Sequence, residues 1–195
     1  MNTLSKYLFG ALASAGLASS AWAAPVTSNP GLLQGTGYSA TVVFVYEDAG
    51  DMSDLRLNAG GKVIFNNKLD AIGTTVQLGN LSGGQDFVLE NLSIPAVFHT
   101  NVADRFGDYH ARITTNYADF NVGGLSSAAS AALASISSPI IYVGWEDRIG
   151  GDYDYNDLIF AFSAAPDPVP EPATLALVCA SFAGFGLTRR RRKGA

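Results

Sequence analysis

The sequence predicts a mainly β protein, an antiparallel β-sandwich of the jelly-roll kind with one short helix. Two observations support this class. Short runs rich in Val, Ile, Phe, Tyr and Thr recur along the chain, and Gly, Asn or Asp residues separate them. The runs expected to form strands are 38–46, 62–66, 74–81, 86–92, 96–100, 109–115, 140–145 and 158–162.

A single folded domain is expected over residues 24–165 of the 195-residue chain, because both ends have the composition of targeting segments. This domain contains fifteen acidic and six basic side chains, a net charge of −9. Such a charge disfavours nucleic acid as a partner and favours divalent cations or solubility. The only cysteine, Cys179, lies outside the domain, so no disulfide is expected within it.

One helix is expected over 125–136. Its apolar residues recur at helical spacing, as Leu125, Ala129, Ala132, Leu133 and Ile136. Ser126 or Ser127 is the expected N-cap, and Pro139 follows the end of the helix. We expect this helix to pack on one edge of the sandwich. A flexible Ala/Ser linker is the alternative interpretation.

Residues 1–23 have the pattern of a secretory signal peptide. A polar start with Lys6 precedes an apolar run over 7–18, and Ala21 and Ala23 form an Ala-x-Ala cleavage site. A buried N-terminal helix is the alternative. The signal peptide predicts export through the secretion machinery.

The C-terminal end has three parts: a proline-rich linker at 166–172, an apolar segment at 173–188 and a basic tail at 189–195. As a helix of 1.5 Å rise per residue, the apolar segment spans about 25 Å, slightly less than a bilayer core. We therefore predict a short transmembrane helix whose basic end stays in the cytoplasm.

The order of Pro170-Glu171-Pro172, apolar helix and arginine cluster resembles the PEP-CTERM sorting signal of Gram-negative bacteria. The resemblance implies that exosortase, an integral-membrane cysteine protease, recognises Pro170, Glu171 and Pro172 and removes the tail. It also implies an intermediate tethered to the inner membrane by the C-terminal helix, followed by a location at the cell surface or outside the cell.

An acidic turn joins the apolar runs 140–145 and 158–162. It contains the candidate metal ligands Glu146, Asp147, Asp152, Asp154, Asn156 and Asp157. Five carboxylates in one turn repel each other unless a cation neutralises them, and oxygen ligands without His or Cys favour Ca²⁺ over zinc. The alternative is that Asp, Asn and Gly are simply good turn formers on a solvated hairpin.

The spacing of Asp152, Asp154 and Asn156 matches the opening of an EF-hand loop, but the later positions do not. Asp157 stands where that loop needs Gly, and Ser163 stands where it needs Glu. We therefore expect a strand-flanked loop in which the three side chains point to one side and Tyr153 and Tyr155 to the other. The stretch 144–162 also resembles the terminal signature of an uncharacterised domain of secreted bacterial proteins, whose commonest inferred property is calcium binding.

A second acidic stretch, 46–55, has a similar order of aromatic, Glu-Asp, Gly-Asp and Asp-Leu. It predicts either a second ion site or a meeting of the two acidic loops at one end of the sandwich. Chance similarity is the other interpretation.

The sequence has no catalytic motif, and its only histidines, His99 and His110, are expected to be structural. We therefore expect a non-enzymatic, calcium-stabilised protein associated with exopolysaccharide or biofilm. One alternative is a carbohydrate-binding module in which Trp145, Tyr153 and Tyr155 stack on sugars. A glycan hydrolase that uses a carboxylate pair is the other.

Overall fold

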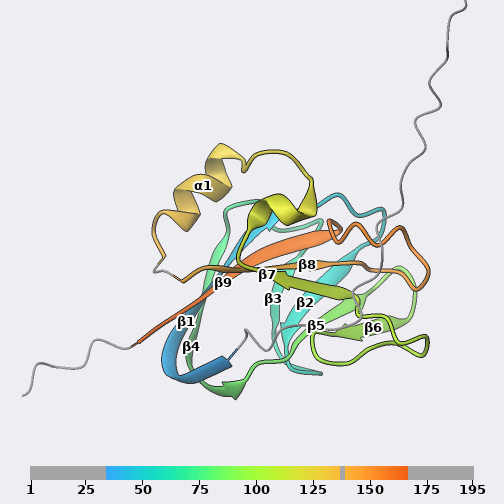
Figure 1. Ribbon diagram of the computed structural model, residues 1–195, viewed down its shortest axis with the longest axis horizontal. Coiled ribbons are helices and arrows are strands. Elements are labelled where there is room, and N and C mark those ends of the chain that lie inside the picture. The colour runs from blue at the N-terminus through green and yellow to red at the C-terminus, as the bar shows by residue number, and fades with distance from the viewer. Residues whose placement is uncertain (1–33, 137–138, 167–195) are drawn as a thin grey trace, which may run out of the picture.

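The computed structural model describes residues 34–136 and 139–166, which form two antiparallel sheets (Figure 1). The five-stranded sheet has the order β4-β1-β9-β8-β7 and the four-stranded sheet the order β3-β2-β5-β6. The mainly β, antiparallel sandwich class is confirmed. The strands are β1 (Gln34–Tyr46), β2 (Ser53–Leu57), β3 (Val63–Asn66), β4 (Thr75–Gly84), β5 (Phe87–Asn91), β6 (Ala96–His99), β7 (Ala111–Thr114), β8 (Ile141–Trp145) and β9 (Leu158–Pro166).

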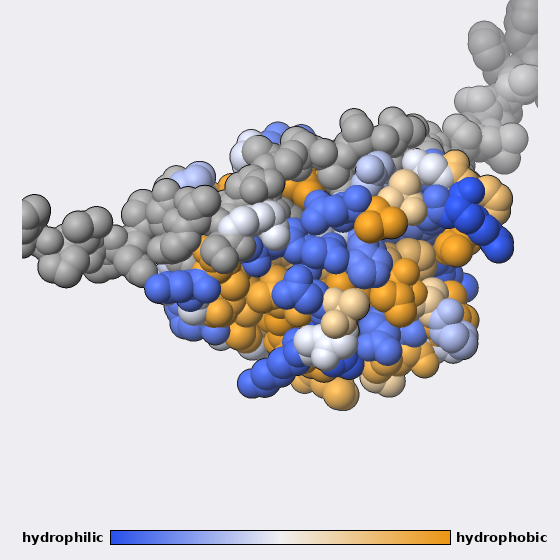
Figure 2. Space-filling view, turned by 90° about the horizontal axis from the view of Figure 1, so that it is seen from below, coloured by the Kyte–Doolittle hydropathy of each residue, from blue (hydrophilic) through white to orange (hydrophobic). Residues whose placement is uncertain are grey.

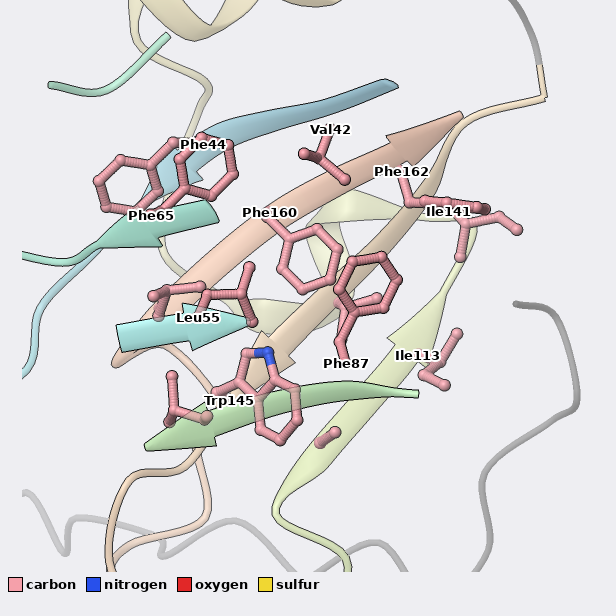
Figure 3. Packing of buried hydrophobic residues seen from close by; sticks show 14 of the residues in the cluster. Val42, Phe44, Leu55, Phe65, Phe87, Ile113, Ile141, Trp145, Phe160 and Phe162 are labelled. Atoms are coloured by element: carbon pink, nitrogen blue, oxygen red, sulfur yellow. The ribbon is translucent and has the colours of Figure 1, made fainter. Parts of the chain in front are cut away.

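The core between the sheets consists of alternate residues of each strand, because successive side chains of a strand point to opposite faces. From the five-stranded sheet, Phe44 and Phe160 point into this core, where they meet Phe65 and Phe87 of the other sheet (Figure 3). Phe44 and Phe65 stack with their centroids 5.4 Å apart, and Phe87 lies 4.7 Å from Phe160. Aromatic packing therefore joins the two sheets.

The outer face of the five-stranded sheet is also buried. Residues such as Val43 and Ile159 pack there against the helix α1 (Ser127–Leu133) and the 3-10 helix η1 (Tyr117–Phe120). A sheet covered on both faces needs strands that are apolar throughout, which explains the continuous apolar runs in β1 and β9.

The predicted helix exists, and Ser126 is its N-cap, since the Ser126 hydroxyl accepts a hydrogen bond of 3.1 Å from the Ala129 N–H. The helix is shorter than the predicted 125–136, and it lies over the outer face of the five-stranded sheet, not at an edge (Figure 1). Its buried residues include Ala129 and Leu133, and a stripe with so much alanine can approach a sheet face closely.

The main strand that the sequence analysis missed is β2. Its residues alternate, with Leu55 fully buried and the charged Asp54 and Arg56 on the opposite face. Arg56 makes ion pairs of 2.9 Å with Asp54 and 2.8 Å with Glu90 on the neighbouring strand β5. The charged residues made this segment resemble part of an acidic loop. Three strands also extend beyond their predicted bounds: β1 begins at Gln34, β4 ends at Gly84 and β9 ends at Pro166.

Gly144 on β8 provides a test of this packing. A Cβ at this position would overlap the carbonyl oxygen of Tyr155 and the ring of Phe120. We expect Gly144→Ala to lower the free energy of unfolding by about 1–3 kcal/mol, as overpacking does. Urea unfolding measures the effect. Gly124→Ala is the control, because a Cβ at Gly124 meets nothing within 4 Å. Equal midpoints for the two variants would contradict the packing described for this face.

Candidate metal centre

The loop 146–157 connects β8 to β9 at one end of the sandwich, and it brings the predicted carboxylates together. Two groups form, and they share Glu146. In each group the carboxylate oxygens lie within 4.8 Å of one another. The groups are Glu146 with Asp152 and Asp154, and Glu146 with Asp147 and Asp157. Asn156 lies beside the first group, and its amide donates a hydrogen bond of 2.6 Å to Asp154. We call these six residues the candidate metal centre.

The backbone of this loop coils instead of running extended. Tyr153 and Tyr155 adopt left-handed φ angles of 57° and 62°, which are uncommon for bulky residues. The segment is therefore turning, not extended, and it still gathers the three side chains: Asp152 and Asp154 share one carboxylate group, and Asn156 donates to Asp154. The coil places the Tyr153 N–H where it donates to the Glu146 carboxylate at 2.8 Å. A Cβ at Gly151 would overlap the same carboxylate, so this close approach requires glycine.

The contacts of Tyr155 offset the strain of its left-handed conformation. Its side chain is fully buried, and its hydroxyl donates to the Tyr109 carbonyl oxygen at 3.0 Å. The guanidinium of Arg112 lies 4.6 Å from the centre of its ring. A buried aromatic ring therefore anchors the coil to the sandwich, and the loop does not depend on Asp and Asn turn propensity alone.

Two of the three aromatic rings predicted to form a carbohydrate-binding platform are buried. Trp145 and Tyr155 are both 0% exposed, so neither ring can meet a sugar. Tyr153 is partly buried, and its hydroxyl donates to Asp108 at 3.3 Å. Trp145 packs in the core between the two sheets, and Tyr155 packs on the outer face of the five-stranded sheet. The two rings therefore support the loop from both sides of that sheet.

The carboxylates of the candidate metal centre crowd one another and differ in burial: Glu146 and Asp147 are buried, Asp154 and Asp157 are partly buried, and Asp152 is exposed. Glu146 is 3% exposed, and burial together with the charges of Asp157 and Asp152 raises its pKa to about 8. Burial and the neighbouring charges of Asp147 and Asp154 raise the pKa of Asp157 to about 7. Burial also raises the pKa values of Asp147 and Asp154. A proton or a cation bound here relieves the repulsion.

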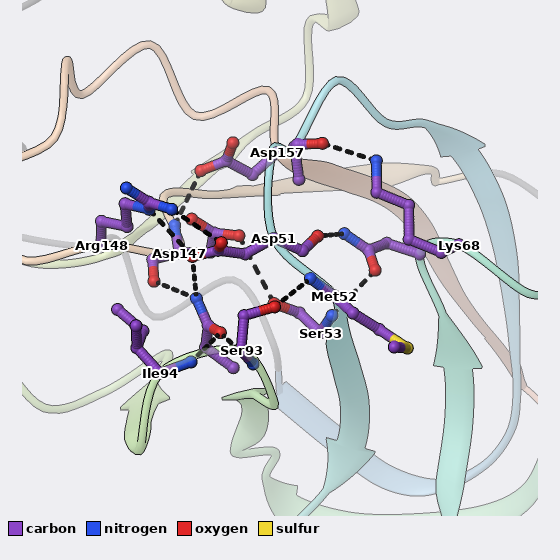
Figure 4. Close-up of polar contacts among 12 residues, drawn as sticks. Asp51, Met52, Ser53, Lys68, Ser93, Ile94, Asp147, Arg148 and Asp157 are labelled. Atoms are coloured by element: carbon purple, nitrogen blue, oxygen red, sulfur yellow. Dashed lines mark hydrogen bonds and ion pairs between the residues drawn. The ribbon is translucent and has the colours of Figure 1, made fainter.

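The second acidic stretch meets this loop, as one of the sequence interpretations expected. The carboxylate of Asp51 accepts hydrogen bonds of 2.8 and 2.7 Å from the guanidinium of Arg148 (Figure 4). Asn91 donates to both the Asp51 carboxylate and the Asp147 carbonyl oxygen, at 2.9 Å each. The hydrogen bonds from Arg148 and Asn91 lower the pKa of Asp51. This carboxylate is therefore neutralised by protein groups, and neither carboxylate group found in the described residues contains a member of the stretch 46–55.

Sequence reasoning missed Asn91, and it expected His110 to be structural without placing it beside the loop. Asn91 ends a strand and belongs to no metal-ligand motif, so its role depends on strand pairing alone. His110 is buried and stacks on Phe98 with centroids 4.0 Å apart. Its Nδ1 contacts the Glu146 carbonyl oxygen at 3.0 Å, and its Nε2 contacts Asp104 at 3.3 Å. Because a carbonyl oxygen only accepts, Nδ1 carries a proton, and His110 holds the start of the loop in place.

Comparison with known families concerns the C-terminal end. Residues 168–192 match the family model of the PEP-CTERM protein-sorting motif. The chain carries a PEP-CTERM sorting motif. No curated protein shows significant similarity to the chain. The motif makes this an exported protein that is sorted through exosortase and passes through a membrane-anchored step.

The PEP-CTERM motif and the other targeting segments lie outside the described residues. These are the sorting residues Pro170, Glu171 and Pro172, the signal segment 1–23 with Ala21 and Ala23, the apolar segment 173–188 and the tail 189–195. Over 34–136 and 139–166, no helix combines the length and apolar character needed to cross a membrane.

β9 connects the candidate metal centre to the segment of sequence that leads to the sorting motif. β9 begins at Leu158, next to Asp157, and ends at Pro166, two residues before the matched segment begins. Figure 1 shows the C-terminal end of β9 at the left of the sandwich and the loop that precedes β9 at the right. At about 3.4 Å per residue, the strand separates the two ends by roughly 27 Å.

The raised pKa values of Glu146 and Asp157 predict how stability depends on pH. An acid with a raised pKa binds protons more tightly in the folded state, so stability falls as pH rises from the unfolded value to the folded value. For Glu146 that window runs from 4.5 to about 8. We expect the melting temperature in EDTA to fall as pH rises from 5 to 8. Asp51 has a lowered pKa, so the stability that its ionised form contributes is lost only at pH values below this window.

Differential scanning fluorimetry of the full chain in detergent, over this pH series, measures the slope. Glu146→Gln removes one of the two acids with a strongly raised pKa, and it is expected to flatten the dependence of the melting temperature on pH. A melting temperature that rises from pH 5 to pH 8 in EDTA would contradict the described environment of Glu146.

Proposed function

We propose that this chain is a non-enzymatic, calcium-stabilised surface or extracellular-matrix protein that associates with exopolysaccharide after exosortase processing. The observation that supports it best is the convergence of four aspartates on Glu146, which is buried and belongs to both carboxylate groups. Carboxylates crowded in this way destabilise a folded loop unless a cation neutralises them. The PEP-CTERM motif supports the location outside the inner membrane.

The ligand chemistry favours calcium. Carboxylate and amide oxygens are the donors available in the candidate metal centre, and Ca²⁺ takes six to eight oxygen ligands in flexible geometry. Zinc prefers Cys and His, and the nearest histidine, His110, already uses both ring nitrogens. Extracellular calcium modules bind with Kd values of about 10⁻⁴–10⁻³ M, a range that suits an exported protein.

The burial of the carboxylates supports a structural role over hydrolysis. A glycosidase needs two carboxyl groups that face a substrate. Glu146 and Asp147 are each 3% exposed, and the Asp157 carboxylate accepts a hydrogen bond of 2.8 Å from the Asp147 N–H. One oxygen of each of Glu146, Asp147 and Asp157 lies within 4.8 Å of the others, which supports an ion site over a pair of carboxyl groups that face a substrate.

Calcium removal tests this proposal. We expect EDTA to lower the melting temperature of the full chain in detergent at pH 7.5, relative to millimolar calcium. At 1 mM calcium and the Kd range given above, the ion is at about 1 to 10 times its Kd and stabilises by about 0.4–1.4 kcal/mol, which corresponds to roughly 1–5 °C for a domain of this size. Magnesium is the comparison ion, because it demands a smaller octahedral site and is expected to stabilise less. Equal melting temperatures in calcium and EDTA would refute calcium stabilisation.

Glu146→Gln tests which residues hold the ion, because Glu146 belongs to both carboxylate groups. We expect this variant to lose the calcium-dependent rise in melting temperature. Glu90→Gln is the matched control, since Glu90 lies on β5 and pairs with Arg56. A full calcium response in Glu146→Gln, or an equal loss in Glu90→Gln, would show that the ion does not bind at the candidate metal centre.

Tail processing tests the proposed route. We expect replacement of Pro170 and Pro172 by alanine to leave the uncut chain in the membrane fraction, because the altered residues belong to the matched motif. Immunoblots of membrane and culture-medium fractions, with an epitope placed after Ala24, measure the distribution. Glu90→Gln again serves as the control and is expected to be released normally. Equal release of both variants would contradict processing at this motif.

A further inference from the structure

Several large apolar side chains reach the surface, and Figure 2 shows hydrophobic residues among hydrophilic ones on the underside of the molecule. Phe106 is 65% exposed, at the tip of the loop between β6 and β7. The guanidinium of Arg105 lies 4.8 Å from the centre of the Phe106 ring. The tip therefore presents an aromatic face and a group of hydrogen-bond donors together.

Hydrogen bonds to Asp104 hold the tip in shape. Its carboxylate accepts from the N–H groups of Phe106 at 2.7 Å and Asp108 at 3.1 Å. Its own N–H donates to the Asp108 carbonyl oxygen at 2.8 Å, and Gly107 takes a φ of 91° within the turn. Burial opposes ionisation of Asp104, but these N–H groups and His110 lower its pKa overall. Phe106 is thus displayed on a preorganised turn.

The same turn is connected to the candidate metal centre. Asp104 contacts His110, and His110 contacts the Glu146 carbonyl oxygen. Tyr153, from the middle of the metal loop, donates to Asp108 at 3.3 Å. The tip and the metal loop therefore form one supported unit at this end of the sandwich.

A shallow hollow of about 230 Å³ lies beside the tip. Its lining includes the exposed apolar side chains of Val97, Val102 and Ile149, together with His99 and Arg105. Ile149 comes from the metal loop, so ordering of that loop also orders one wall of the hollow. Apolar walls with a few polar groups are typical of small-molecule and sugar sites.

We propose that Phe106, Arg105 and this hollow bind a neutral polysaccharide. The surface lies at the end of β9 opposite to Pro166, from which the chain continues to the sorting motif. The domain carries a net charge of −9 over 24–165, which repels anionic polymers. Pyranose rings stack on an exposed aromatic face while their hydroxyls accept from a guanidinium.

This inference rests on the proposed function for the location of the protein, and it names the partner. It assigns the sugar-stacking role to Phe106, which solvent reaches, and not to the buried rings of Trp145 and Tyr155.

Isothermal titration calorimetry of the full chain in detergent tests the site, with cellohexaose and mannohexaose as neutral probes and hexagalacturonate as the anionic comparator. We expect binding of at least one neutral probe and none of the anionic one. Phe106→Ala is expected to weaken that binding at least tenfold. Leu69→Ala is the matched control, because Leu69 is an apolar residue exposed to 79% that lies outside the lining of the hollow.

The inference is overturned if neither neutral hexasaccharide binds, if hexagalacturonate binds more tightly, or if Phe106→Ala and Leu69→Ala behave alike. The melting temperature of Phe106→Ala in calcium and in EDTA is measured on the same samples. A normal calcium response without glycan binding refutes this inference alone. Glycan binding with no calcium response refutes calcium stabilisation and leaves the glycan site supported.

Discussion

The repulsion among buried carboxylates in the loop between β8 and β9 is the constraint on which the rest of this structure depends. Glu146 has little contact with solvent and shares its surroundings with the four aspartates. Groups in such a position are stable only when protonated or neutralised by a cation. Proton binding, or the calcium binding that we propose, therefore stabilises this end of the sandwich.

The sandwich supplies the support that such a loop needs. Tyr155 adopts a left-handed conformation that an isolated turn would rarely populate, and the covered outer face of the five-stranded sheet provides its burial and its contact with Arg112. On the other side, the Asp51–Arg148 pair and Asn91 connect the loop to the four-stranded sheet. Both sheets thus contribute to the position of the same carboxylates.

The central strand β9 connects the candidate metal centre at one end of the domain to the start of the C-terminal segment at the other. Because β9 lies between β1 and β8, the final strand of the described chain is also an interior strand of its sheet. One end of this strand leads to the PEP-CTERM motif and the other begins at the candidate metal centre. The metal loop and the Phe106 tip therefore lie at the end of the domain opposite to Pro166.

Local composition determined the elements whose signal is complete within a short stretch. The alternating and apolar runs predicted most strands, Ser126 predicted the helix start, and Pro170-Glu171-Pro172 with the apolar and basic segments predicted the sorting motif. The same reasoning missed β2, because two charged residues masked its alternation, and placed α1 at an edge, because a helical pattern carries no information on which sheet face it covers.

The sequence by itself determined that carboxylates crowd one turn and that the chain carries a sorting motif near its C-terminal end. Only the tertiary structure decided that Glu146 is shared by two groups, that Asp51 is paired with Arg148, and that Trp145 and Tyr155 are buried. The physical reason is that spacing along a chain reports residue types and local geometry, whereas burial and pairing depend on which strands become neighbours.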